Sequence, residues 1–253
     1  MDEPEHLDQP EGMTSPPEDT SHSLGARVIN VIEIVVVALA GPILAPVLFA
    51  FAGVPPERIL SSVHFVVSLM LTEASITLPI IYILVRLRGQ KLRSIGWWRG
   101  SFGREAAIGL AFLPILFAST ILISQFFQHV FPQYATLKNP LLDLVQSPGQ
   151  LLLMILSSLY VGGLKEETQR AFVLTRFDEN LGGAVAGLVL WSLFFGYGHL
   201  IQGFDNAIAA GALGLIFGLL FIWRRSITGP MIAHAAYDVL TLIVYWEFVA
   251  ALS

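Results

Sequence analysis

Hydrophobic residues occur along the chain in seven long runs, each about the 20 residues that a helix needs to cross a lipid bilayer. We place these runs at residues 28–53, 60–86, 105–128, 149–172, 182–202, 206–223 and 227–250. Gly41, Pro42 and Pro46 interrupt the first run, which therefore predicts either one helix or two half-spans. The pattern predicts an all-α fold, a polytopic transmembrane bundle of seven or eight helices around a polar intramembrane cavity.

The composition supports a membrane protein. Hydrophobic residues make up 55% of the 253 residues and charged residues 13%, whereas soluble domains carry about 25% charged residues. Residues 1–26 differ from the rest, with seven acidic residues, four prolines and no lysine or arginine. Such a segment buries too little apolar surface to fold, so we predict a disordered acidic tail over 1–26. Residues 27–253 then form one transmembrane domain, with the candidate motifs at 149–245.

Basic residues gather in three of the connections between the runs. The connection at 86–104 carries six lysines and arginines, Arg176 follows the fourth run, and Arg224-Arg225 follows the sixth. If seven spans alternate, these connections lie on the same side as the N-terminus. Basic loops favour the cytoplasmic side, so the N-terminus is predicted to be cytoplasmic. With no eukaryotic sorting signal, a bacterial inner membrane is the expected location.

Two further features of the composition exclude some functions. The chain has no cysteine, which excludes disulfides, cysteine-ligated zinc and a cysteine nucleophile. It has no basic arm that would indicate nucleic-acid binding. It also lacks the H-E-x-x-H, G-x-S-x-G and G-x-x-x-x-G-K-[ST] motifs.

Three polar clusters lie in the apolar runs of the C-terminal half. They are Glu166-Glu167-x-x-Arg170, His199, and His234-x-x-x-Asp238. An ionisable side chain at the centre of a bilayer costs about 2.5–3.5 kcal/mol on insertion scales, so each cluster is a candidate functional site. On a helix, one arginine a turn away can neutralise only one of two adjacent carboxylates well. The other carboxylate is then free to accept a proton or to bind a metal.

Each cluster alone also has a structural interpretation, as a solvated helix end, a hydrogen-bonded core histidine or an Asp–His pair. Together their roles complement each other. A carboxylate and a histidine can deprotonate water, and a second imidazole can stabilise an oxyanion. Glu166, His199 and His234 equally suit a zinc centre with one open position, so metal-bound water and water activated directly by glutamate are both consistent with these residues. Glu33, His64 and Glu73 are isolated in the first two runs and are interpreted as structural.

The order of these motifs resembles the CAAX-protease and bacteriocin-processing (CPBP) family of intramembrane proteases, the type II CAAX prenyl endopeptidases. That order is Glu-Glu-x-x-x-Arg, then Phe-x-x-x-His, then His-x-x-x-Asn/Asp. Here the corresponding residues are Glu166-Glu167 with Arg170 after two intervening residues, Phe195 with His199, and His234 with Asp238. The resemblance covers about residues 149–245.

Besides this shorter spacing before Arg170, the chain departs from the family pattern at two places. Thr168, Gln169 and Ala171 stand where many relatives have apolar or aromatic residues and a glycine. At Asp238, an ionised aspartate cannot donate a hydrogen bond to an oxyanion, whereas asparagine can. Asp238 must then be protonated, orient His234 or bind a metal.

The resemblance implies an endopeptidase that hydrolyses a peptide bond within the membrane. It implies that Glu166 and His199 activate the water, that His234 and Asp238 act at the oxyanion, and that Glu167, Arg170 and Phe195 support the site. Zinc is the cofactor that it suggests, held by Glu166, His199 and His234. The expected partners are the lipid bilayer and a membrane-associated peptide or protein substrate, which need not be prenylated.

Two other classes of function stay open. The same fold could serve as a non-catalytic membrane scaffold or an immunity-type protein, with its polar core kept for binding a partner. A proton-coupled carrier could use the acids and histidines as a relay. The absence of an evident internal repeat counts against the carrier.

Overall fold

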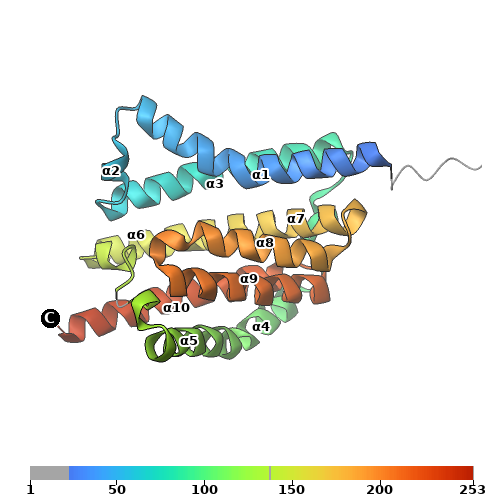
Figure 1. The fold of residues 1–253 in the computed structure, drawn as a ribbon. Helices are drawn as coiled ribbons and strands as arrows, with labels where there is room; N and C mark the ends of the chain where they lie inside the picture. Colours follow the sequence, from blue (N-terminus) through green and yellow to red (C-terminus); the bar gives the residue numbers. More distant parts are fainter. Residues whose placement is uncertain (1–22, 137, 253) are drawn as a thin grey trace, which may run out of the picture.

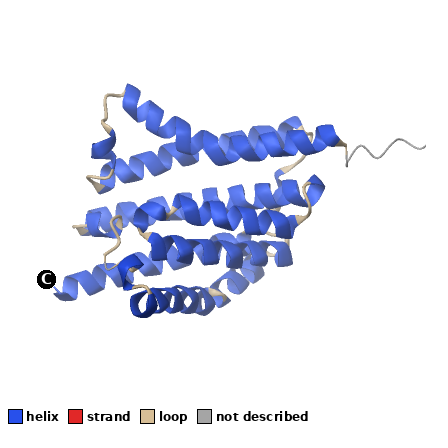
Figure 2. Ribbon diagram, viewed as in Figure 1, coloured by secondary structure: helices blue, strands red, loops and turns tan. Residues whose placement is uncertain are grey.

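The chain folds into a helical bundle, as the hydrophobic runs predict. The computed structural model describes residues 23–136 and 138–252, and no β-strand occurs in those two ranges (Figures 1 and 2). The predicted all-α membrane fold is confirmed. The α-helices are α1 (Leu24–Phe51), α2 (Pro56–Ile59), α3 (Val63–Leu87), α4 (Phe102–Ala111), α5 (Leu113–Val130), α6 (Pro148–Ser158), α7 (Glu167–Asn180), α8 (Ala184–Gly198), α9 (Phe204–Arg224) and α10 (Thr228–Leu252).

Shorter helical pieces connect these elements. A π-helical segment, η5 (Leu159–Glu166), joins α6 directly to α7, so that residues 148–180 form one uninterrupted helix. Single 3-10 turns are η2 (Leu92–Ile95), η3 (Pro132–Tyr134), η4 (Leu142–Leu144) and η6 (Leu200–Gln202).

The helices lie roughly parallel in layers. In Figure 1, α1 and α3 form one layer, the α6–α7 helix and α8 form the next, and α9, α10 and the α4–α5 pair follow. The main core lies where α1, α3, α7 and α8 meet, around buried Val37, Ile81, Phe172 and Trp191. A second core cluster joins α3, α6 and α10, and a third joins α5, α9 and α10.

The seven apolar runs correspond to helical segments, with four differences. The third run forms two consecutive helices, α4 and α5. The first run is a single helix, α1, that continues through Pro42 and Pro46, so the half-span alternative is wrong. The fourth run ends at 180 instead of 172 because buried polar residues of α7 continue the helix. The fifth helix ends at Gly198, before the predicted boundary at 202. Residues 1–22 of the predicted acidic tail (1–26) lie outside the described residues, and the end of that range is helical, because α1 begins at Leu24.

Four helical segments are long and apolar enough to cross a membrane, counted over the described parts of the chain. They are Leu24–Phe51, Val63–Leu87, Phe102–Val130 and Phe204–Arg224. The α8 helix is apolar but shorter, and the 148–180 helix carries the Glu166-Glu167-Arg170 cluster. The protein is therefore an integral membrane protein in which the most polar helix is surrounded by apolar ones.

The two ends of the bundle differ in charge. We call the end with the start of α1 and the connections 88–101, 181–183 and 225–227 the basic end (Figure 1). We call the opposite end, with connections 52–62, 131–147 and 199–203, the far end. Ten of the 14 lysines and arginines lie at the basic end: Arg27, Arg86, Arg88, Lys91, Arg93, Arg99, Arg104, Arg176, Arg224 and Arg225. Only Arg58 and Lys138 lie at the far end.

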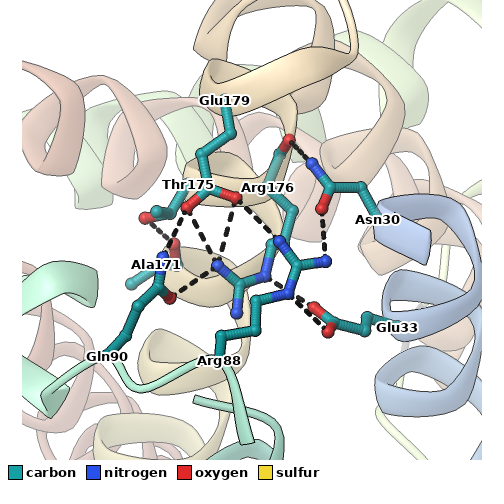
Figure 3. Close-up of polar contacts among 8 residues, drawn as sticks. All are labelled: Asn30, Glu33, Arg88, Gln90, Ala171, Thr175, Arg176 and Glu179. Carbon is teal, nitrogen blue, oxygen red and sulfur yellow. Dashed lines mark hydrogen bonds and ion pairs between the residues drawn. The ribbon is translucent and has the colours of Figure 1, made fainter. Parts of the chain in front are cut away.

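A buried ionic cluster at the basic end fastens α1 to α3 and α7 (Figure 3). The carboxylate of Glu33 on α1 accepts from Arg88 Nε with one oxygen and from Arg176 Nε with the other, each at 2.7 Å. Arg176 Nη1 also donates to Glu179 Oε1 at 2.9 Å. The Asn30 side chain joins both arginines, because its amide donates to Arg176 O at 2.9 Å and its oxygen accepts from Arg88 at 2.5 Å. Glu33, an isolated acid in the sequence, thus bridges two cations.

Removing the bridging charge should therefore destabilise the bundle. Arg176 is fully buried, and breaking a buried ion pair by removing one partner costs about 3–5 kcal/mol. We expect Glu33→Gln to lower the free energy of unfolding by that order, measured by thermal or denaturant unfolding in detergent. Arg225→Ala is the matched control, since Arg225 pairs with Asp178 on the surface and such exposed pairs contribute about 1 kcal/mol or less. Equal effects of the two substitutions would contradict this account.

Candidate functional site

The site is built on the π-helical segment in the middle of the 148–180 helix. A π-helix bonds i to i+5 and so places one more residue in a turn than an α-helix, which is a frequent device at functional sites. Within η5, Gly162 and Gly163 face α10 at very short range. A Cβ at Gly162 would collide with Asp238 Oδ2 and lie 3.3 Å from His234 Nε2, and one at Gly163 would lie 3.0 Å from the Ala235 Cβ. The two glycines thus bring α10 against the segment that carries the glutamates.

Three consecutive side chains leave the end of this segment in three directions. Lys165 is buried and its Nζ donates to Glu73 Oε1 of α3 at 2.5 Å. Glu166 lines a cavity, and its side chain is 19% exposed. Glu167 points to α10 and is almost fully buried. The helix is therefore held on two sides, and the carboxylate between the two anchors faces the cavity.

Glu167 is the centre of a buried polar network. Its Oε1 accepts hydrogen bonds from both Arg170 Nη1 and His234 Nδ1, the latter at 2.7 Å. The other nitrogens of the Arg170 guanidinium have no hydrogen-bond partner, and the group lies 4.8 Å from the Phe195 ring centroid and 5.4 Å from that of Phe217. Contacts of this kind between a cation and ring faces are favourable in a desolvated site. Arg170 thus neutralises Glu167 and leaves Glu166 without an arginine partner.

His234 is fixed in orientation from two directions. Because Nδ1 donates to a carboxylate, the opposite nitrogen, Nε2, is the one that faces the cavity. Nε2 lies 3.7 Å from Glu166 Oε2 and 3.7 Å from Asp238 Oδ2. The ring also stacks on Phe217, with centroids 4.6 Å apart and planes 18° apart. The residue that orients His234 is therefore Glu167, while Asp238 stands beside the free nitrogen.

His199 is the C-cap of α8 and lies against Phe195 one turn earlier. Its Nδ1 contacts the Phe195 carbonyl oxygen at 2.7 Å, and since a carbonyl only accepts, Nδ1 is the donor and Nε2 is left as the acceptor. The Phe195 ring lies between the two histidines, 4.5 Å from the His199 centroid and 6.3 Å from that of His234. Gly196 allows α8 to approach α9 closely, since a Cβ there would lie 2.8 Å from Ala207 O.

A cavity of about 250 Å³ collects these side chains. It is lined by Glu166, His199, His234, Asp238 and Phe195 together with residues of α3, α5, α6 and α9. Of the residues predicted from the sequence, these five face the cavity, whereas Glu167 and Arg170 are buried behind it. The arrangement can present a carboxylate and two imidazole nitrogens to a molecule inside the cavity.

Comparison with protein families matches the part of the chain that carries these residues. A family model described as Type II CAAX prenyl endopeptidase Rce1-like matches residues 148–240, which is less than half of the chain. The predicted resemblance is confirmed. This segment is similar to CAAX-type intramembrane proteases. No curated protein and no solved structure matches the chain. The Rce1-like segment runs from the start of α6 into α10 and contains all seven predicted site residues.

The predicted zinc ligands do not form a metal site. Across the described residues, no three histidine, aspartate or glutamate side chains are positioned to hold a metal ion together. The Nδ1 atoms of His199 and His234 are both engaged, which leaves Nε2 of each ring as the nitrogen that could bind a metal. In the described structure, Glu166, His199 and His234 do not come together as a zinc site.

Sequence reasoning missed the polar residues outside the motifs. Asn139, Gln202 and Asn206 line the cavity at the far end, and Lys165 anchors the glutamate-bearing turn through Glu73. For Lys165 and Glu73, the only indication in the sequence was that each charged residue stands in an apolar run. Their spacing of 92 positions gives no hint of contact.

The close packing at Gly162 should make a methyl group there disruptive. Gly162→Ala inserts a Cβ against Asp238 and His234, and overpacking typically costs about 1–3 kcal/mol. We expect a lower unfolding temperature in detergent for this variant. Gly198→Ala is the control, because a Cβ there meets nothing within 4 Å, and we expect an unchanged or slightly higher unfolding temperature. A Gly162→Ala protein as stable as wild type would show that the approach of α10 is looser than described.

Proposed function

We propose that this protein is an intramembrane endopeptidase that hydrolyses a peptide bond with water activated by Glu166. The observation that carries the proposal is the division of labour between the paired glutamates. Glu167 takes the arginine and the histidine, whereas Glu166 faces a cavity that it shares with His199 and His234. Glu166 has no arginine partner, and a carboxylate outside an arginine ion pair is a better proton acceptor than one inside such a pair. The similarity of residues 148–240 to CAAX-type proteases supports the same reaction class.

In the proposed reaction, Glu166 removes a proton from water as the oxygen attacks the carbonyl carbon of the substrate. The C=O π electrons move to the oxygen and form a tetrahedral oxyanion. Collapse of this intermediate breaks the C–N bond, and the proton passes from Glu166 to the departing amine. His199, with Nε2 as an acceptor, holds the water beside Glu166. The products are a carboxylic acid and an amine. The proton taken from water ends on the amine, so the reaction needs no oxidant, reductant or other co-reactant.

His234 acts at the oxyanion in this proposal. Its Nε2 faces the cavity and Glu167 fixes its ring, so the group is oriented before the charge develops, which is the condition for effective electrostatic stabilisation. Asp238 stands 3.7 Å from the same nitrogen. An ionised Asp238 cannot donate to the oxyanion, so its role is to favour the protonated, donating form of His234.

We further propose that the N-terminus is cytoplasmic and that the protein resides in a bacterial cell membrane. The concentration of ten basic residues at one end supports this orientation. The substrate is a membrane-associated peptide or protein, because the site lies in a cavity between apolar helices.

The decisive test is cleavage by purified protein in detergent, with a peptide library read by mass spectrometry. General acid–base groups typically contribute about 10²–10⁴-fold to a rate, so Glu166→Gln should reduce turnover by that order. Glu247→Gln, on the exposed part of α10, is the matched control and should cleave at the wild-type rate. Unfolding temperatures of both variants separate lost chemistry from lost structure.

Other outcomes of this test have clear meanings. Full activity in Glu166→Gln would overturn the assignment of the base. If folded wild type cleaves nothing, the endopeptidase proposal fails and a non-catalytic scaffold becomes the better explanation. Metal analysis of the same wild-type sample tests the zinc prediction, since stoichiometric zinc would require a ligand arrangement different from the one described.

A further inference from the structure

The cavity extends from the site toward only one end of the bundle. Besides the site residues, its lining comes from the 131–147 connection, the 199–203 connection and the first turn of α9, all at the far end. These lining residues include Asn139, Leu141, Leu142, Gln202, Asp205 and Asn206. The lining contains no residue from the connections 88–101, 181–183 or 225–227, which form the basic end.

Apolar packing closes the route from the site to the basic end. Beyond Arg170 on α7 come Phe172 and Leu174, beyond Phe217 on α9 comes Phe221, and the basic-end connections contribute Ile95 and Ile227. All five of these apolar residues are buried and belong to the main core cluster. Because interiors of this kind are packed as densely as organic crystals, they leave no path for a peptide.

The far-end wall of the cavity is polar and fixed in place. Thr136 donates to Asp205 from its backbone nitrogen at 3.0 Å and from its hydroxyl at 2.5 Å. Asn139 donates to Gln202 Oε1 at 3.1 Å. These bonds hold the segment after α5 against the start of α9. Thr120 and Ser124 of α5 lie deeper in the cavity. Together with the amides and hydroxyls of the far-end wall, they can form hydrogen bonds with water and with the backbone of an extended peptide.

We propose that the substrate reaches the site from the far end, which is the extracytoplasmic side of the membrane. Access from the far end follows from the polar lining and the apolar seal, and the side follows from the ten basic residues at the opposite end. The substrate is then a protein segment exposed outside the cytoplasm or inserted from there. That a substrate uses this route rests on the proposed peptidase function, whereas the route itself depends only on the fold.

The chain offers an unusually clean test because it has no cysteine. Three serines allow matched Ser→Cys variants: exposed Ser61 at the far end, exposed Ser101 at the basic end, and Ser124 in the cavity. Each variant is produced in cells and treated with a small, membrane-impermeant sulfonate thiol reagent, before and after permeabilisation. We expect Ser61→Cys and Ser124→Cys to react in intact cells, and Ser101→Cys only after permeabilisation.

Each other pattern of labelling overturns the proposal in a defined way. If Ser124→Cys reacts only after permeabilisation while Ser61→Cys reacts in intact cells, the cavity opens toward the basic end. If Ser101→Cys alone reacts in intact cells, the orientation is reversed and the substrate is cytoplasmic. If Ser124→Cys reacts under neither condition while the two exposed variants do, the cavity is closed to water.

A second readout connects the route to the reaction. In purified protein, modification of Ser124→Cys should reduce cleavage at least tenfold because the sulfonate occupies the route, whereas modification of Ser61→Cys should leave cleavage unchanged. Unhindered cleavage by fully modified Ser124→Cys would contradict the route. Labelling does not depend on enzymatic activity. If the peptidase proposal is wrong, no variant will cleave, and the labelling pattern will still report the route.

Discussion

The arrangement of the site depends on one buried oxygen atom, Glu167 Oε1. It accepts from Arg170 on its own helix and from His234 on α10, so a single carboxylate joins the two helices and sets the tautomer of the histidine. A carboxylate at this depth would be costly alone, and the two donors offset its desolvation. Because the arginine is used in this way, the adjacent Glu166 has no arginine partner and its carboxylate faces the cavity.

The sequence was sufficient for the helices and for the residues that meet at the site. Apolar runs predicted every long helix, because a membrane span requires both length and apolarity. Glu166, His199, His234 and Asp238 stood out because ionisable groups in apolar runs are rare, and they do line one cavity. Which glutamate pairs with Arg170 was not predictable, since both are within one turn of it and only the position of α10 decides.

Other features depend on tertiary contacts that local patterns do not encode. Glu33 and Glu73 were interpreted as structural, and their partners, Arg176 and Lys165, stand 143 and 92 positions away. The depth of His199 also depended on a helix end, since α8 stops at Gly198 and places this histidine in a cap. The polar far-end wall consists of ordinary loop residues, whose composition resembles that of any solvated connection.

The π-helical segment has a consequence for how such chains can vary in length. A π-helical turn accommodates an extra residue while the α-helices on both sides keep their positions, so an insertion or deletion there changes the helix type and not the packing. In this chain Arg170 follows the glutamate pair after two residues, where the family pattern has three. The π-helical segment ends at Glu166, whereas the shorter spacing between Glu167 and Arg170 lies in α7. The segment can therefore absorb a residue gained or lost before the glutamate pair, but a change within the motif itself alters the position of Arg170 relative to the pair.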